Sequence, residues 1–233
     1  FAQGLLAAFP VEAGLPPGFM ALDERAAARL RARALSELIE AAAASGDEGF
    51  LDDLAELAVA SGENGVRTAL ATMLRHAEGL LALPAADGIE VAVRRFLGVD
   101  ADATVEALRA AAFACGGRTD LLVAAYADAM ETWGTATGRE CAAAAREWLC
   151  GDGAGRARNY AKLRDLFLTK DGEPKGWKNA LKKMPELGPV LQEMAGELLQ
   201  LEARIATIEL AAHAARHLRV GQRYVAHYTR LKQ

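Results

Sequence analysis

The apolar residues of this chain recur at three- and four-residue steps almost throughout, and runs of four to eight β-branched or aromatic residues are missing. Hydrophobic residues make up 52% of the 233 residues, which is enough for a real core. Many of them are alanines, strong helix formers whose small side chains let helices pack closely. The sequence therefore predicts an all-α fold with several helices and little or no sheet. Because the helix spacing varies, a solenoid repeat is not predicted.

Capping residues, glycines and prolines indicate where the helices begin and end. Asp23 is the expected N-cap of the first helix, while Gly62 and Pro84 mark breaks further along. The predicted helices cover residues 23–44, 50–60, 64–83, 89–97, 104–114, 121–135, 139–150, 156–168 and 177–184. The residues expected to face inward are Leu30, Leu35, Leu38 and Ile39 in the first helix, and Val66, Leu70, Met73, Leu74 and Leu81 in the third.

A long C-terminal helix is predicted from about Val190 to the end of the chain. A bend is expected at Gly221. The apolar residues that recur along this helix and should face a core are Leu198, Leu201, Ile205, Ile208, Ala212 and Leu218.

Both ends of the sequence look cut. Phe1 stands inside an apolar helical pattern, and the final helix reaches Gln233 without a glycine, asparagine or proline stop signal. We therefore expect the chain to be an excised piece of a larger protein.

Charge is distributed unevenly along the sequence. Residues 151–233 hold 15 Lys+Arg and 9 Asp+Glu, and subtracting these from the chain totals of 27 and 31 leaves 12 and 22 for residues 1–150. The overall charge of −4 thus conceals a basic half of about +6 and an acidic half of about −10. A local basic surface can bind nucleic acid even when the whole chain is acidic.

Several other kinds of site are not predicted. The three cysteines form no C-x-x-C pair, no apolar run is long enough to span a membrane, and no G-x-x-x-x-G-K-[ST] motif for a phosphate loop occurs. Glu209, His213 and His217 share one helical face but lack the pattern of a zinc site. Asp52, Asp53 and Glu56 are expected on a solvated face. No catalytic residue, metal or cofactor is therefore predicted in this chain.

The strongest candidate site is a basic segment, residues 151–189. It interleaves cations, which can neutralise phosphates, with aromatic rings, which can stack on bases. The candidate DNA-binding residues are Arg156, Arg158, Tyr160, Lys162, Arg164, Lys170, Lys175, Trp177, Lys178, Lys182 and Lys183, with Phe167 as a further aromatic in the same stretch. The alternative is a solubilising face above buried aromatics.

Three stretches of the sequence resemble one family. FAQGLLAAFPVEAGLPPGF (1–19), followed by Met20 to Glu24, is similar to the segment after the threonine–histidine motif of UvrD-like superfamily 1 DNA helicases. YVAHYTRLKQ (224–233) resembles the helix that precedes their Walker B region, and FLTKDGEP (167–174) resembles a segment between the two. The details are most similar to AddA, the helicase–nuclease subunit of bacterial double-strand-break repair, in its alphaproteobacterial form.

The resemblance implies a place for the chain in a larger machine. It would be subdomain 1B, a single helical insertion domain over residues 1–233 of the first motor domain. Residues 1–20 and about 218–233 would be the roots, and the long C-terminal helix would be the return limb. ATP, Mg²⁺ and any exonuclease activity would belong to the parent protein, located in the bacterial cytoplasm. The implied partners are duplex DNA and an AddB-like subunit.

Two functions remain open at this point. The chain could be an accessory domain that guides duplex DNA toward a helicase motor, without catalysis of its own. It could instead be a helical docking module whose acidic half binds a partner subunit.

Overall fold

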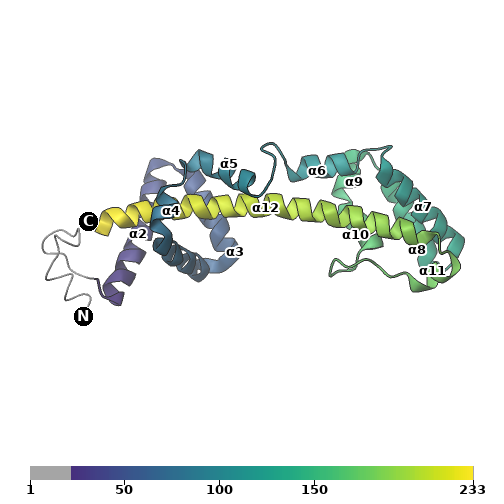
Figure 1. Ribbon diagram of the computed structural model, residues 1–233, viewed down its shortest axis with the longest axis horizontal. Helices are drawn as coiled ribbons and strands as arrows, with labels where there is room; N and C mark the ends of the chain where they lie inside the picture. The colour runs from purple at the N-terminus through teal and green to yellow at the C-terminus, as the bar shows by residue number, and fades with distance from the viewer. Residues whose placement is uncertain (1–21, 233) are drawn as a thin grey trace. The chain divides into compact units, whose positions relative to one another are not determined.

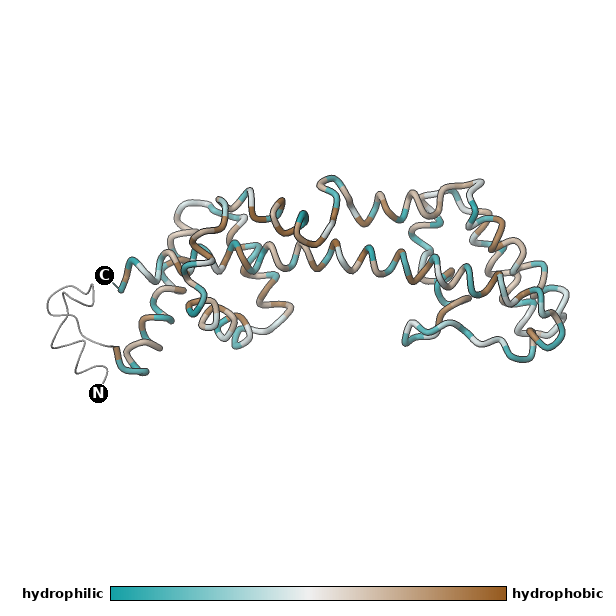
Figure 2. The backbone as a smooth tube through the Cα atoms, in the orientation of Figure 1, coloured by the Kyte–Doolittle hydropathy of each residue, from teal (hydrophilic) through white to brown (hydrophobic). Residues whose placement is uncertain are grey.

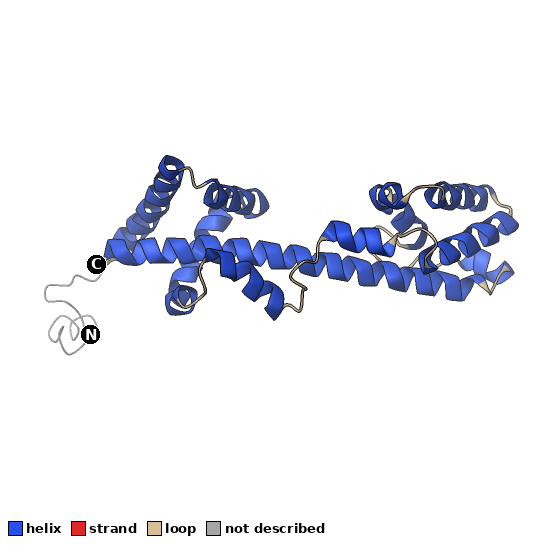
Figure 3. Cartoon of the chain, turned by 90° about the horizontal axis from the view of Figure 1, so that it is seen from above, coloured by secondary structure: helices blue, strands red, loops and turns tan. Residues whose placement is uncertain are grey.

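The computed structural model describes residues 22–232, and Figures 1 and 3 show that this part of the chain is built from helices. The all-α prediction is confirmed. The described residues contain no sheet, only one isolated antiparallel bridge between Leu168 and Pro174. The helices are α2 (Glu24–Ser45), α3 (Glu48–Met73), the 3₁₀ turn η1 (Leu74–His76), α4 (Ala77–Leu81), α5 (Ala86–Phe96), α6 (Val105–Ala112), α7 (Arg118–Trp133), α8 (Ala136–Leu149), α9 (Gly153–Arg158), α10 (Tyr160–Phe167), α11 (Lys178–Lys183) and α12 (Leu187–Lys232).

The chain divides into two compact units where the sequence predicts a single domain. Unit 1 runs up to Glu90 and resumes at His213, whereas unit 2 is Val91–Ala212. The predicted long helix is confirmed as α12, whose first part belongs to unit 2 and whose last part belongs to unit 1. Hydrophobic and hydrophilic residues alternate along its whole length (Figure 2). The predicted root at 1–20 lies outside the described residues, and the root at 218–233 falls, up to Lys232, in the last turns of α12.

Unit 1 packs α2, α3 and α4 against the end of α12. Asp23 caps α2 as predicted, because its Oδ1 accepts a hydrogen bond from the Ala26 N–H at 2.6 Å. Gly46 ends this helix in the left-handed conformation, with φ 69°. The buried core of unit 1 consists of Ala34, Leu38, Ala42, Phe50, Leu57, Val66, Leu70, Leu80, Val220, Tyr224 and Val225.

Unit 2 packs α7, α8, α10 and α11 around the first part of α12. Its core contains the predicted residues Leu198, Leu201 and Ile205, together with aromatic side chains from α7 and α8. The largest fully buried side chains of this unit are Tyr126, Phe113, Phe167, Met130, Leu163, Leu168, Leu187, Met194 and Leu198. Tyr160, Phe167 and Trp177 of the basic segment belong to this core or pack against it, which limits their exposure to solvent.

The breaks between helices match the predicted ones except at two places, the 3₁₀ turn η1 and the break at Asn159. Gly62 breaks α3 with φ 71°, as expected, but the predicted third helix tightens into η1 near its end. A 3₁₀ turn has fewer residues per turn than an α-helix, so it changes which of the following side chains face the core. Leu80 is buried and Leu81 is exposed, whereas the sequence predicted Leu81 to face inward. Ile39 was also predicted to face inward but is exposed. The predicted basic helix 156–168 is split into α9 and α10 at Asn159.

Gly221 marks a close approach between helices. The residue is buried inside α12, which runs through it without interruption. A Cβ added at this position would collide with the thioether of Met73, at the end of α3. The missing side chain of Gly221 therefore lets α3 pack close to α12. The sequence predicted a bend at this glycine and did not predict the close helix packing.

Candidate nucleic-acid interface

All the predicted DNA-binding residues lie in unit 2, on α9, α10, α11 and the loop between α10 and α11. The backbone of this loop turns back on itself, since the Thr169 N–H donates to Glu173 at 2.7 Å and the Lys175 N–H donates to Phe167 at 2.8 Å. The structure thus brings the basic segment together on one unit. The individual side chains differ greatly in their exposure.

Arg156 is a core residue of unit 2. Its side chain is 4% exposed, and Nη1 lies 2.6 Å from the Asp120 carboxylate on α7. Nη2 donates to the Leu149 carbonyl at 2.6 Å, and the guanidinium lies 5.0 Å from the centre of the Trp148 ring. An arginine buried and paired in this way has no surface to offer a phosphate. The DNA-binding prediction is therefore not supported at Arg156.

Tyr160 and Arg164 meet at one carboxylate of α12. The Tyr160 hydroxyl donates to Glu202 Oε1 at 2.8 Å, and Arg164 Nε donates to the same oxygen at 2.6 Å. Burial, with this hydrogen bond to Glu202, raises the pKa of the Tyr160 hydroxyl. The hydrogen bond to Glu202 also raises the pKa of Arg164. The Tyr160 ring also stacks on Phe113. Through these contacts, Tyr160 and Arg164 attach α10 to the rest of unit 2.

The other aromatics of the basic segment are also packed within unit 2. Phe167 is 1% exposed and lies against Tyr126, with 4.6 Å between the ring centres. Trp177 lies edge-on to Tyr126 and to Trp133, both on α7. Base stacking by these rings, which the sequence pattern suggested, would require them to leave their packing partners. The interface must therefore act through charge.

The remaining cations are exposed, except for Lys175, which is half-buried. Lys162 pairs with Glu147 at 3.0 Å, and Lys175 donates to the Asp165 carbonyl. Five exposed cations form no ion pair or hydrogen bond with another described residue, and we call them the exposed basic set: Arg158, Lys170, Lys178, Lys182 and Lys183.

Three members of the exposed basic set lie on α11. Ala180 of this short helix and Met184, which directly follows it, are buried. Lys178 and Lys182 are four residues apart and therefore project from the same side, while Lys183 lies next to them. The basic segment is not purely cationic, because Asp165, Asp171, Glu173 and Glu186 are also exposed. Its 9 basic and 5 acidic residues leave a net charge of +4.

Comparison with family models, with curated proteins and with solved structures found no match.

A cluster of arginines in unit 1 was missed by the sequence reading. Arg216, Arg219 and Arg223 follow one another along α12 and bind acids at the start of α3. Their partners are Glu56 at 2.9 Å, Asp53 at 2.7 Å and Asp47 at 2.6 Å, respectively. Asp53 was expected on a solvated face, but its side chain is only 14% exposed. Three arginines of the basic half of the sequence therefore compensate the charge of three acids of the acidic half.

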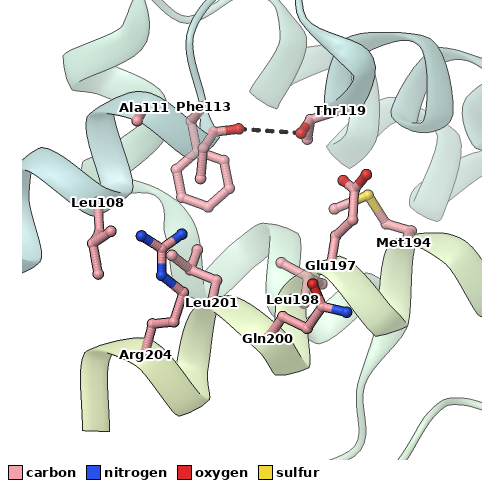
Figure 4. Close-up of a pocket in the computed structure, with 11 residues that line it drawn as sticks. Leu108, Ala111, Phe113, Thr119, Met194, Glu197, Leu198, Gln200, Leu201 and Arg204 are labelled. Carbon is pink, nitrogen blue, oxygen red and sulfur yellow. Dashed lines mark hydrogen bonds between the residues drawn. The ribbon is translucent and has the colours of Figure 1, made fainter. Parts of the chain in front are cut away.

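Unit 2 also contains an open cavity of about 340 Å³ between α6, α7 and α12 (Figure 4). Leu108, Phe113 and Leu201 provide apolar walls, and the Arg204 guanidinium lies at its edge. The Thr119 hydroxyl donates to the Ala112 carbonyl at 3.1 Å beside it. No pair of a nucleophile and a base converges on this cavity, so its lining does not indicate catalysis.

Two further observations bear on alternative functions. Within the described residues, no group of three or more potential metal ligands comes together. His213 and His217 instead contact each other edge to face, with 4.5 Å between their ring centres. No helix in the part of the chain covered by the structure is long and apolar enough to cross a membrane.

Proposed function

We propose that this chain is a DNA-contacting accessory domain of an ATP-dependent DNA helicase and exonuclease that acts in double-strand-break repair and recombination. The observation that carries this proposal is the exposed basic set, five cations of one unit that have no partner among the described residues. The sequence resemblance to subdomain 1B of UvrD-like helicases, and to AddA in particular, supports this choice of parent protein.

The domain guides duplex DNA toward the motor by contacting phosphates. Cations that neutralise phosphates release counterions, and this binding needs no base readout. Because Tyr160, Phe167 and Trp177 are engaged in unit 2, the contact has no base-stacking component. The parent's motor would supply the ATP and Mg²⁺ sites, since the chain itself contains no phosphate-loop motif.

The packing of unit 1 supports an inserted domain. The Tyr224 hydroxyl, near the end of α12, donates to the Arg31 carbonyl on α2 at 3.3 Å. Close by, His227 Nε2 lies 2.9 Å from Glu37 Oε2. Segments from early and late in the described chain therefore lie together, as an insertion with neighbouring entry and exit points requires.

A salt titration with labelled duplex DNA tests the proposal. We expect weak, sequence-independent binding with a Kd of about 10⁻⁴–10⁻⁶ M, which weakens as salt rises. Replacing Lys178, Lys182 and Lys183 by glutamine should weaken binding and make the salt dependence shallower.

The matched control replaces Arg25, Arg29 and Arg75 of unit 1, which are also exposed and form no ion pair with a described residue. This control removes the same charge and should leave binding within about twofold of the unmodified chain, because nonspecific long-range effects are screened at physiological salt. Equal losses from both triple variants would show that net charge alone is responsible, and would refute a localised interface.

A second candidate function is docking to an AddB-like partner subunit. The observation that favours it is an apolar groove of about 510 Å³ in unit 1, between α2 and α3. Leu35, Ile39 and Leu54 contribute to its lining. An Ile39→Asp variant should lose a partner bound in this groove while retaining any salt-dependent DNA binding. Partner binding that Ile39→Asp does not affect would exclude the groove.

A further inference from the structure

Trp177 has an unusual backbone conformation directly before α11. Its φ is 31° and its ψ is 35°, and among the described residues it is the only non-glycine residue with positive φ. A bulky side chain disfavours this left-handed region, so surrounding contacts must maintain the conformation.

The indole ring provides these contacts. Its centre lies 6.3 Å from the ring centre of Tyr126 and 6.3 Å from that of Trp133. On the loop side, Lys175 Nζ lies 5.8 Å from the ring centre. The indole Nε1 is buried without a hydrogen-bond partner among the described residues. Packing, and not a hydrogen bond from the indole, therefore holds the ring in place.

Trp177 also begins the helix that carries most of the exposed basic set. Its carbonyl accepts the hydrogen bond from the Leu181 N–H at 3.0 Å, which closes the first turn of α11. The helix has only 6 residues and is too short to be stable alone. Its direction must come from the residues that bind it to the core, namely Trp177, Ala180 and Met184.

We propose that Trp177 is the positioning residue of the basic surface. Its ring and its left-handed backbone together fix α11 on α7, so that Lys178 and Lys182 project side by side toward solvent. The DNA role of these lysines rests on the proposed function, whereas the ordering of α11 does not. Trp177 itself makes no contact with DNA, and its effect on binding passes through the lysines.

The first experiment measures hydrogen exchange of the α11 amides without DNA. Trp177→Phe keeps a smaller aromatic ring between Tyr126 and Trp133 and loses the unpaired N–H with the rest of the pyrrole ring, so slow exchange at Leu181 and Met184 should be largely retained. Trp177→Ala removes the ring and should raise exchange at both amides at least tenfold, while α8 stays protected. Unchanged exchange in Trp177→Ala would overturn the positioning role.

A second variant covers the case in which Trp177→Ala does not fold. Trp177→Leu keeps an apolar side chain of intermediate size, and the fluorescence of Trp133 and Trp148 reports whether unit 2 remains folded. If Trp177→Leu also unfolds unit 2, Trp177 is a core residue of the whole unit and the proposal is wrong.

The second experiment couples Trp177 to the lysines in the DNA titration. Lys178→Gln with Lys182→Gln should lower the salt slope by about 1.8, since each phosphate contact contributes about 0.9. Trp177→Ala should produce a similar loss, and adding the two lysine changes to it should cost nothing further. If Trp177 does not position the lysines, the losses of DNA affinity from Trp177→Ala and from the two lysine changes should instead add up in the combined variant.

The two experiments separate the proposals. If the lysine changes alone leave DNA binding intact, the proposed function fails, while the hydrogen exchange result still decides whether Trp177 orders α11. If the lysine changes weaken binding but Trp177→Ala adds fully to them, the positioning role fails and the DNA interface stands.

Discussion

Arg219 binds Asp53 through two parallel hydrogen bonds, Nε to Oδ2 at 2.7 Å and Nη2 to Oδ1 at 2.8 Å, across 166 positions of sequence. This bidentate geometry is the strong form of an arginine–carboxylate pair. The two side chains are 23% and 14% exposed, so solvent screens the pair only in part. It joins the end of α12 to the first half of α3.

Removing the charge of Asp53 should destabilise unit 1. We expect Asp53→Asn to lower the free energy of unfolding by about 1–3 kcal/mol, between the values for exposed and for buried pairs. The matched control is Glu63→Gln, which breaks the more exposed Arg67 pair on the same helix and should cost about 0.3–0.5 kcal/mol.

Two probes assign the effect to unit 1. All 3 tryptophans of the chain lie within Val91–Ala212, so their fluorescence follows unit 2. Circular dichroism follows both units. Asp53→Asn should shift the urea transition seen by dichroism and leave the fluorescence transition in place. Equal effects of the two substitutions would show that the Arg219 pair is no stronger than a surface pair.

Two arginines of α9 should respond in opposite ways to the same substitution. Arg156→Gln leaves the largely buried Asp120 carboxylate without its cation, so we expect a loss of about 3–5 kcal/mol in unit 2. Arg158→Gln should change stability by less than about 0.5 kcal/mol, because its side chain is exposed and unpaired. Urea denaturation followed by tryptophan fluorescence measures both. A stable Arg156→Gln variant would contradict the structural role given to Arg156.

Two glycines of α12 should also differ when each is changed to alanine. A Cβ at Gly196 meets nothing within 4 Å, so Gly196→Ala should stabilise unit 2 by about 0.5–1 kcal/mol. Gly221→Ala should lose this gain, because its Cβ meets the Met73 thioether. In a Met73→Ala background, Gly221→Ala should again be favourable. A Gly221→Ala variant as stabilised as Gly196→Ala would show that Met73 moves aside at no cost.

Unit 1 should lose stability as the pH falls below neutrality. Burial lowers the pKa of His213, and the neighbouring charges of His217 and Arg216 lower it further, against an opposing effect of Glu56 on α3. The unfolded chain, with an ordinary histidine pKa of about 6.5, therefore binds this proton before the folded chain does. The His213 contribution is complete above pH 6.5 and is lost as the pH falls through that value toward the lower folded pKa.

Replacing His213 by glutamine should flatten this dependence. Urea midpoints measured by circular dichroism at pH 7, 6 and 5 should fall less steeply in His213→Gln than in the unmodified chain. If the midpoints of both proteins fall equally with pH, groups other than His213 cause the pH dependence. At lower pH a second loss is expected, since hydrogen bonds from Arg33 to Glu37 and from Arg223 to Asp47 lower the pKa of these two carboxyls.

Local sequence signals predicted the helices well because caps and breaks are local. Asp23 accepts its own capping bond three residues ahead, and Gly62 breaks α3 through its own backbone angle. Neither feature depends on distant parts of the chain. The long helix α12 was predicted for the same reason, from the periodicity of its own residues.

Long-range pairing was not visible in the sequence. Arg219 counted toward a basic half, yet its charge is used by Asp53 of the acidic half. Arg156 and Trp177 read as parts of a basic, aromatic surface, but the exposure of a side chain depends on which helix packs over it. Within the candidate site, the structure agrees with the predicted exposure at Arg158 and at the lysines that have no partner among the described residues, while their DNA-binding role stays a prediction.

The division of unit 1 into two stretches of sequence has a consequence for the order of events during biosynthesis. The core of unit 1 includes Val220, Tyr224 and Val225, which leave the ribosome long after α2 and α3. Unit 2 is continuous in sequence and can assemble while those residues are still being added. The nascent chain must therefore hold α2 and α3 with an uncovered apolar face until the end of α12 emerges. During translation, this interval leaves apolar side chains exposed that the complete unit buries, and transiently exposed apolar surface favours aggregation.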